Sequence, residues 1–322
     1  MSAPAKKPLP ESSAPGPAHP ARPRSEVRAR AKSWTVGERP LGMLLNRALQ
    51  RRGGGDSEVF LALHPRGGNV VVRFSRRRGD DPRDPVQRER AHGGGPRHPN
   101  LVHVMGGGSI DGQSYVVREA VEGVPLDVVV EALAARGAVL GPPLVAMLGL
   151  RLARALDHLH RRGGTDGLVH GDVRPRNVIL SRSGQVRLLD LGSAQPMGDA
   201  VVLAPRSGAA RFRDAPSPSL RPEAAVDVHM LGRTLATLAL GAWPSAARLH
   251  DALPELVPEV ARFVLPCLAP PAERPSSSAV FARLIHQALP GIEGWGERDL
   301  VRALRSRGRP GAESGLRRRS WA

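Results

Sequence analysis

Residues 168–194, LVHGDVRPRNVILSRSGQVRLLDLGSA, constrain the fold more than any other stretch of the chain. Two apolar runs flank a turn at 181–184, and this pattern predicts a β-hairpin. The hairpin would bring Asn177 and Asp190 together, with Asp172 beside them in the preceding loop. An amide oxygen and carboxylates that converge make a hard oxygen-donor site, which suits Mg²⁺ because that ion completes its shell with water and phosphate. The stretch therefore predicts a site for magnesium and phosphate.

The rest of the chain has a strand-rich first third and a helix-rich remainder. EVFLALHPRGGNVVVRF at 58–74 predicts a second hairpin, and SYVVREAV at 114–121 predicts another strand. The segment 86–100 begins as a helix, which three consecutive glycines should keep short. From about residue 126 helical patterns predominate, and the segment 142–163 places leucines on one apolar stripe. This order predicts two lobes.

The two ends of the chain have few apolar residues to bury. Residues 1–36 are rich in Pro, Ala, Ser and charge, and we expect them to be disordered. Residues 290–322 contain a short possible helix near 297–305, followed by a basic tail. We therefore expect the chemistry to lie between these ends.

Cysteine content and charge limit the classes of protein to consider. The single cysteine, Cys267, excludes an intramolecular disulfide, and no apolar run approaches the roughly 20 residues that cross a bilayer, so we expect a cytoplasmic protein with no membrane span. The net charge of +17 is typical of binding to nucleic acid or anionic lipid. Aromatic residues make up only 3%, however, so the stacking side chains of single-strand binders are missing. Nucleic acid or an acidic partner bound by the basic tails remains a minor alternative.

The hairpin stretch carries a family resemblance. HGDVRPRN at 170–177 resembles the H-R-D-x-K-x-x-N catalytic loop of the eukaryotic-type Ser/Thr protein kinases of bacteria, and DLG at 190–192 resembles their D-F-G motif. The resemblance runs from about residue 40 to 289. It implies an α+β, two-lobed protein-kinase-like fold, with a small β-rich N-lobe at 37–121 and a larger helical C-lobe at 122–289. It also implies ATP and Mg²⁺ as cofactors and a protein as substrate or partner.

The resemblance assigns roles to individual residues. Asp172 becomes the candidate base for a substrate hydroxyl, and Arg174 stands where these kinases have a lysine near the transferred phosphoryl group. Asn177 and Asp190 become the metal ligands. Contacts to the nucleotide fall on residues of both lobes, namely Gly54, Val59, Val71, Arg73, Glu89, Glu119, Val121 and Ile179.

Other matching positions have supporting roles in the family. Asp227, in DVHMLG, matches the aspartate that anchors the catalytic loop, and His170 and Leu191 match packing residues between the lobes. Arg274 matches an arginine that pairs with a glutamate at the end of the activation segment. In this chain DAPS at 214–217 replaces the family's A-P-E, so that glutamate is missing, and Glu223 and Glu273 remain as alternative partners of Arg274.

The N-lobe departs from the pattern of active kinases. Arg73 replaces the lysine that holds the α and β phosphates, and no lysine follows position 32. Glu89, nine residues before HPN, is the expected partner of Arg73. Only Gly54 remains of the three loop glycines, and Arg118 occupies the gatekeeper position at the back of the adenine pocket. We expect Arg118 to compete with Arg73 for Glu89 and to fill part of that pocket.

These departures leave three readings open. The first is a pseudokinase scaffold or very weak kinase, in which the ligands for metal remain but phosphoryl transfer is weak or lost. The second is an active Ser/Thr kinase that uses Arg73 in the lysine role. The third is binding of nucleic acid or an acidic partner through the basic tails.

Overall fold

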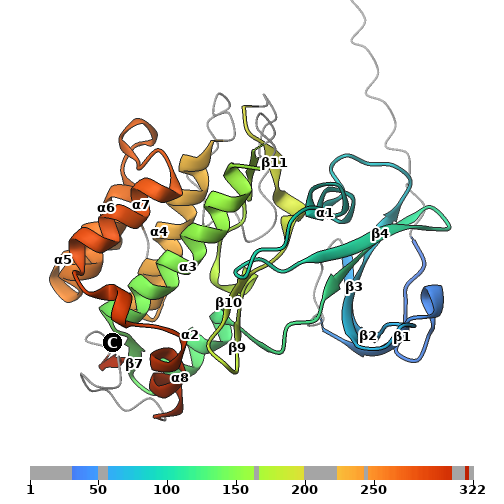
Figure 1. Ribbon diagram of the computed structural model, residues 1–322, viewed down its shortest axis with the longest axis horizontal. Helices are drawn as coiled ribbons and strands as arrows, with labels where there is room; N and C mark the ends of the chain where they lie inside the picture. Colours follow the sequence, from blue (N-terminus) through green and yellow to red (C-terminus); the bar gives the residue numbers. More distant parts are fainter. Residues whose placement is uncertain are drawn as a thin grey trace, which may run out of the picture.

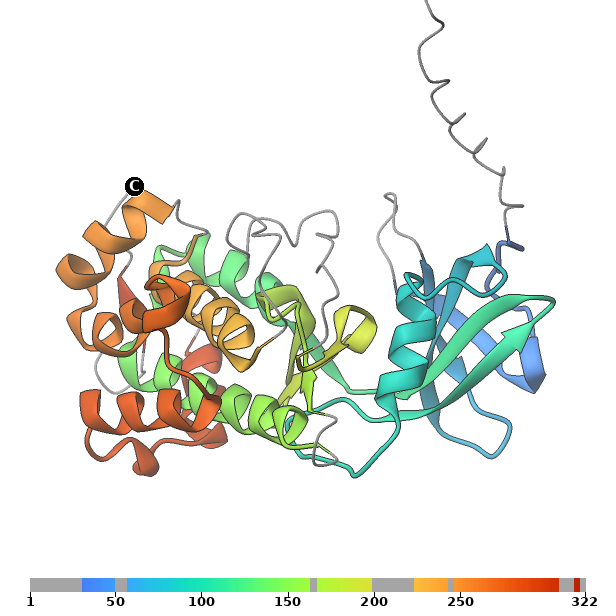
Figure 2. The ribbon, with the colours of Figure 1, turned by 90° about the horizontal axis from the view of Figure 1, so that it is seen from above.

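The computed structural model describes residues 31–49, 57–162, 167–198, 223–242, 246–306 and 316–318. These residues form two lobes, one built from a β-sheet with helix α1 and the other mainly from helices (Figure 1). Figure 2 shows the same two lobes from above. The predicted α+β class and two-lobed architecture are therefore confirmed.

The N-terminal lobe is a five-stranded antiparallel sheet in the order β1-β2-β3-β5-β4. Its strands are β1 (Leu44–Ala48), β2 (Ser57–Leu63), β3 (Asn69–Arg78), β4 (Val104–Ile110) and β5 (Gln113–Glu119). Val70, Val72 and Phe74 alternate along β3 and are buried, as expected for a strand with one face on the core. The predicted hairpin at 58–74 is the β2–β3 pair.

Helix α1 (Pro85–Gly93) packs against this sheet and carries Glu89. Asp84 caps its first turn by accepting a backbone N–H. The helix ends at Gly93, where a Cβ atom would collide with the side chain of Val104 on β4. The helix is short, as predicted, and the lack of a side chain at Gly93 lets it approach the sheet closely.

The C-terminal lobe is built around α3 and α4, which pack against each other. Its helices are α2 (Leu126–Ala134), α3 (Pro142–His160), α4 (Ala224–Leu240), α5 (Ala246–Leu256), α6 (Pro258–Leu268), α7 (Ser278–Ala288) and α8 (Glu297–Arg305). The predicted apolar stripe of α3, including Leu144, Leu148, Leu152 and Leu156, is fully buried in the main core. Within the described ranges, no helix combines the length and apolar character needed to cross a membrane.

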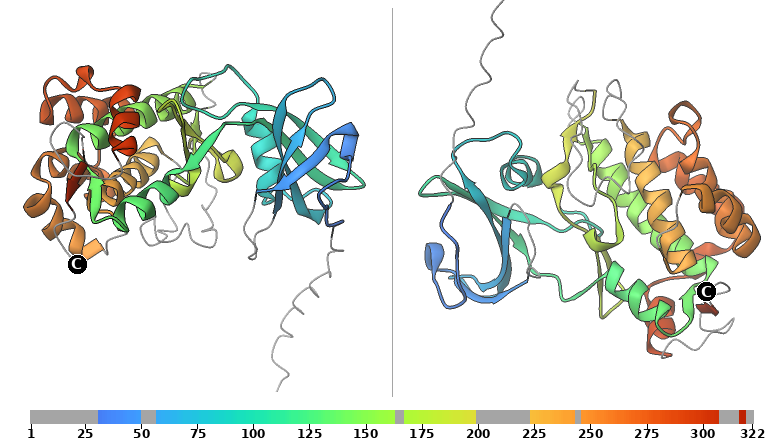
Figure 3. Two further views of the ribbon diagram at one scale, coloured as in Figure 1. Left: turned by 90° about the horizontal axis from the view of Figure 1, so that it is seen from below. Right: turned by 180° about the vertical axis from the view of Figure 1, so that it is seen from behind.

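The rest of the described chain contains seven short strands. They are β6 (Gly123–Pro125), β7 (Ala138–Leu140), β8 (Leu168–Val169), β9 (Val178–Ser181), β10 (Val186–Leu188), β11 (Gln195–Pro196) and β12 (Leu316–Arg318). Of these, β6, β8, β9 and β10 lie near the site. The chain crosses from β5 into the C-terminal lobe through β6, which joins the β9–β10 hairpin (Figure 3). The hairpin predicted from the opening stretch is therefore present, with Val178 opposite Leu188.

Both expected domain boundaries need correction. Disorder was expected up to residue 36, yet the indole of Trp34 stacks on Phe74 with ring centroids 5.0 Å apart, and its Nε1 donates to Gln113 at 2.9 Å. At the other end the domain was expected to stop at 289, but Leu300 of α8 is fully buried in the main core. The folded unit therefore extends beyond both limits. Local sequence pattern did not indicate this, because the contacts join residues that are far apart in the sequence.

A truncation tests the N-terminal boundary. Deleting residues 1–36 is expected to lower the free energy of unfolding by about 2 kcal/mol relative to deleting 1–30, because Trp34 leaves its stack on Phe74. Urea unfolding of the two truncated proteins measures the difference. Equal stability of the two would show that Trp34 contributes nothing to the lobe.

Candidate active site

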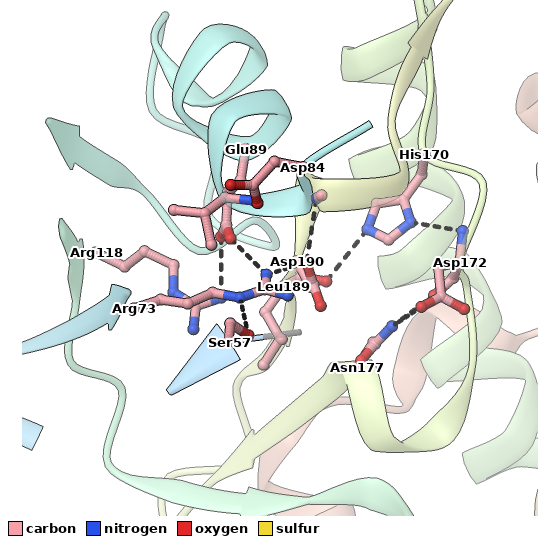
Figure 4. Close-up of polar contacts among 12 residues, drawn as sticks. Ser57, Arg73, Asp84, Glu89, Arg118, His170, Asp172, Asn177, Leu189 and Asp190 are labelled. Carbon is pink, nitrogen blue, oxygen red and sulfur yellow. Dashed lines mark hydrogen bonds and ion pairs between the residues drawn. The ribbon is translucent and has the colours of Figure 1, made fainter. Parts of the chain in front are cut away.

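Four charged side chains at the junction of the lobes form what we call the charge ladder: Arg118, Glu89, Arg73 and Asp190 (Figure 4). Nη1 of Arg118 on β5 lies 3.0 Å from Oε1 of Glu89 on α1. Nη1 of Arg73 on β3 lies 2.8 Å from Oε2 of Glu89 and 2.6 Å from Oδ1 of Asp190. The ladder alternates in sign and contains two cations and two anions, so its formal charges cancel.

Burial makes this cancellation important. Glu89 is 1% exposed, and both arginines are 7% exposed. Burial alone would lower the pKa of the Arg73 guanidinium, but the charges of Asp190 and Glu89 and their hydrogen bonds raise it above its ordinary value. Arg73 therefore stays charged, and Ser57 accepts a hydrogen bond from its Nε at 2.9 Å.

The ladder modifies the expectation for Arg118. We expected competition between Arg118 and Arg73, but the two guanidiniums share Glu89, one on each carboxylate oxygen. The expected Arg73–Glu89 pair is present. No local pattern indicates the contact between Arg73 and Ser57, because Ser57 stands at a position where the family has a loop glycine.

Replacing Arg118 with methionine tests whether its guanidinium blocks the nucleotide pocket that the family resemblance implies. We expect Arg118→Met to tighten Mg-ATP binding about tenfold, or by about 1.4 kcal/mol, because a guanidinium leaves the back of the pocket while Arg73 keeps Glu89. Calorimetric titration measures the affinity, and Arg76→Met, at a half-exposed position of β3, is the control. Affinity that does not rise in Arg118→Met would count against a blocking role.

The candidate base lies in a buried polar cluster on the loop between β8 and β9. Oδ2 of Asp172 lies 2.9 Å from Nη2 of Arg174 and accepts a hydrogen bond from Nδ2 of Asn177, also at 2.9 Å. Oδ1 of Asp172 is buried and has no hydrogen-bond partner among the described residues. Burial lowers the pKa of the Arg174 guanidinium, and the charge of Asp172 offsets part of this effect. One oxygen of Asp172 is thus held in place while the other can accept a proton.

Asp227 of α4 fixes the backbone of this loop. Its two oxygens accept the backbone N–H groups of His170 at 2.7 Å and Gly171 at 2.8 Å, and Nε2 of His160 lies 2.9 Å from Oδ2. Gly171 has φ of +72°, which favours glycine at this position. The predicted anchoring role of Asp227 matches these contacts, and His170 also contacts the carbonyl of Leu189 at 3.2 Å.

The two expected metal ligands lie next to each other. The backbone N–H of Leu189 donates to the carbonyl of Asn177 at 2.9 Å, so the hairpin brings Asn177 beside Asp190. Asp190 has φ of +75°, which aspartate tolerates, and its Oδ1 also accepts the N–H of Gly192 at 3.1 Å. A carboxylate and an amide oxygen fit the hard-donor preference of Mg²⁺. The guanidinium of Arg73 forms its ion pair with this same oxygen, Oδ1 of Asp190.

The remaining nucleotide-contact candidates lie around the junction of the lobes. Register places Val59 opposite Arg73, so Val59, Val71 and Arg73 share one face of the sheet. On the opposite lobe Ile179 pairs with Arg187, whose Nη1 lies 2.6 Å from Oε1 of Glu119. Val121 follows Glu119 at the crossing between the lobes. Gly54 lies outside the described residues, and so do residues 199–217 of the activation segment, which the family resemblance places at 193 to about 217.

Comparison with known proteins identifies the family of the chain. The protein kinase domain matches residues 52–280 of the chain. The chain belongs to the protein kinase family. Within it, the matching relatives are of the Ser/Thr type. One is the probable serine/threonine-protein kinase SCO3848 of Streptomyces coelicolor, 35% identical over 172 residues, or 51% of this chain and 23% of the relative.

Other relatives come from mycobacteria. Serine/threonine-protein kinase PknH of Mycobacterium bovis is 33% identical over 161 residues, which cover 48% of this kinase chain and 25% of the relative. The crystal structure of the PknI kinase domain of Mycobacterium tuberculosis aligns with a TM-score of 0.56 and 25% identity, covering 80% of this chain and all of that domain. The matches therefore span about a quarter of the length of these two curated relatives.

Proposed function

We propose that this kinase domain binds ATP with Mg²⁺ but transfers phosphoryl groups weakly or not at all, and acts chiefly as a signalling scaffold for a protein partner. The ion pair of 2.6 Å between Nη1 of Arg73 and Oδ1 of Asp190 carries this proposal. It places a permanent cation on the carboxylate that would hold the metal. A guanidinium is also larger than the ammonium of the usual lysine and directs its donors differently.

The residues present still fit the nucleotide and its metal. Asn177 and Asp190 offer oxygen ligands on one side of the junction, and Arg73 offers positive charge for phosphate on the other. Bound Mg-ATP would supply the phosphoryl group and a divalent charge next to it. The chain itself would supply the base that activates the acceptor hydroxyl group. Oδ1 of Asp172 lacks a hydrogen-bond partner among the described residues, so it can take the proton of that hydroxyl group.

The weak point is the position of Arg73. Its Nη1 contacts both Glu89 and Asp190, and its Nε donates to Ser57, so the side chain is fixed by three groups. Moving it toward a phosphate would leave buried Glu89 with Arg118 alone. A misplacement of about 1 Å at the phosphate can lower the rate about a hundredfold.

An active Ser/Thr kinase is the second candidate, and one observation favours it. The Arg73–Glu89 pair is formed at 2.8 Å, so the strand and helix that hold phosphate in active kinases are joined here too. Under this reading Arg73 performs the role of the lysine, and Asp172 acts as base.

Substituting lysine for arginine separates the two candidates. We expect Arg73→Lys to raise the rate of radiolabelled phosphoryl transfer from ATP, to casein or to the chain itself, by about tenfold or more, because a smaller cation reaches the phosphates. Asp172→Ala should reduce any activity to background. Robust wild-type activity that falls in Arg73→Lys would instead identify Arg73 as the working phosphate ligand. Arg76→Lys, an exposed change on the same strand, is the control.

A further inference from the structure

A groove with a volume of about 680 Å³ lies on the C-terminal lobe, between α3 and α7, and the turn before β4 closes one end of it. The helices α3 and α7 pack against each other. We call this hollow the α3–α7 groove. Leu150 and three alanines, Ala153, Ala279 and Ala282, give it an apolar lining. None of its lining residues was assigned a role in the site described above.

Basic side chains surround this apolar lining. They are His98, Arg154, His158, Arg161, Arg162 and His286. Among the described residues that line the groove, the one carboxylate is Asp157, which pairs with Arg161 at 3.0 Å. Arg154 is exposed, and it has no ion pair or hydrogen bond with the part of the chain that the structure describes. The groove thus has more positive charge than its own residues neutralise, and a concave surface concentrates such a field.

Two histidines of the groove, His98 and His158, show the effect of this positive charge. His98 stacks on His158 with ring centroids 5.0 Å apart. Burial lowers the pKa of the His98 imidazole, and the nearby charges of His158 and Arg154 lower it further. Nε2 of His158 is buried without a hydrogen-bond partner among the described residues. Two polar rings are therefore packed together where a negative group would be favourable.

We propose that the α3–α7 groove binds an acidic segment of a partner protein, with its carboxylate or phosphate groups on Arg154 and Arg161 and an apolar side chain over Leu150. The guanidinium fork suits both anions because it can donate two parallel hydrogen bonds. An apolar lining within a basic rim fits a peptide better than a nucleic acid, since the groove is lined by no Phe, Tyr or Trp among the described residues on which bases could stack.

The groove also borders the charge ladder. His98, His158 and Arg162 line both the groove and a small cavity of about 20 Å³, whose other wall includes Glu89 and Asp190. A cavity of this size holds about one water molecule. A segment bound in the groove therefore contacts residues that pack directly behind the ladder. The proposal does not depend on nucleotide binding.

Fluorescence anisotropy of the full chain tests the proposal. The probe is a short fluorescein-labelled peptide rich in Glu and Leu, and its counterpart has Gln in place of every Glu. We expect the acidic peptide to bind, the Gln peptide not to bind, and the double variant Arg154→Gln, Arg161→Gln to weaken binding about tenfold or more. NMR titration should show the pKa of His98 rising when the acidic peptide is bound.

The matched control removes two arginines outside the groove, Arg283→Gln and Arg298→Gln, both exposed. This variant should bind the acidic peptide within about twofold of the wild type. Equal weakening in the two double variants would overturn the proposal, because it would mean that overall charge alone attracts the peptide. A single-stranded RNA that displaces the peptide from the wild type, and loses affinity only in the groove variant, would assign the groove to nucleic acid instead.

Discussion

Replacing Glu89 with glutamine is expected to lower the free energy of unfolding by about 3–5 kcal/mol, the range seen when one partner of a buried ion pair is removed. Glu89 is 1% exposed and is the shared anion of Arg73 and Arg118. A neutral amide in its place leaves two buried guanidiniums with only Asp190 to balance them. Chemical denaturation of the wild type and the variant measures the loss.

A second variant shows whether charge is the cause. Arg118→Met added to Glu89→Gln removes the excess cation, so the double variant should recover part of the lost stability. The control is Glu38→Gln, whose exposed ion pair with Lys32 should leave the melting temperature nearly unchanged. A loss in Glu89→Gln that Arg118→Met makes worse would mean that packing around Glu89, and not charge balance, stabilises the ladder.

Replacing Asp227 with asparagine is expected to cost about 3 kcal/mol. Both carboxylate oxygens accept backbone N–H groups, from His170 and Gly171, and asparagine can supply only one oxygen. Its amide would therefore face a backbone donor and leave it unsatisfied. Phosphoryl transfer, where present, should fall as well, because the loop that carries Asp172 loses its anchor. Asp157→Asn, on the more exposed side of α3, is the matched control and should change stability by no more than about 0.5 kcal/mol.

The same aspartate gives the stability a defined dependence on pH. Burial would raise the pKa of Asp227, but the hydrogen bond from His160, the charges of His160 and His170 and the N–H of Gly171 lower it below its ordinary value. A carboxyl whose folded pKa is lowered stabilises the protein above its unfolded pKa, and this contribution is lost as the pH falls through the folded value. As the pH falls below about 4, the advantage of the wild type over Asp227→Asn should therefore begin to shrink, and it should shrink further toward the lower folded pKa. An advantage that persists unchanged at pH 3 would show that the charge of Asp227 is not what matters.

Local pattern was enough to predict the central hairpin and its polar residues. The apolar runs on either side of the turn at 181–184 required antiparallel pairing, and this pairing places Asn177 beside Asp190. Glu89 could be found because its helix lies at a fixed spacing before HPN. These features depend on contacts between residues that are close in the sequence, or on a motif that specifies them.

Long-range contacts could not be predicted in the same way. The attachment of Arg73 to Asp190 joins residues 117 positions apart, and that of Trp34 to Gln113 joins residues 79 apart. Nothing in the local sequence indicates that Arg118 and Arg73 would take different oxygens of Glu89, because the outcome depends on how β3, β5 and α1 pack. The N-terminal boundary was placed too late for the same reason: a single tryptophan in a polar segment gives no periodic signal.

Thermal unfolding in the presence of nucleotide is the direct test of whether Asp190 can bind a metal ion while Arg73 contacts the same carboxylate. The full chain is melted with Mg²⁺ and ATP, with Mg²⁺ alone, with metal-free ATP, and as the Asp190→Asn variant. Exposed Asp80→Asn serves as the control. ATP at about 100 times its dissociation constant should add about 2.7 kcal/mol, which raises the melting temperature by roughly 5 °C. We expect a rise that requires Mg²⁺, persists in Asp80→Asn and disappears in Asp190→Asn. No rise at millimolar ATP, or an equal rise in Asp190→Asn, would show that Asp190 does not bind the metal of Mg-ATP.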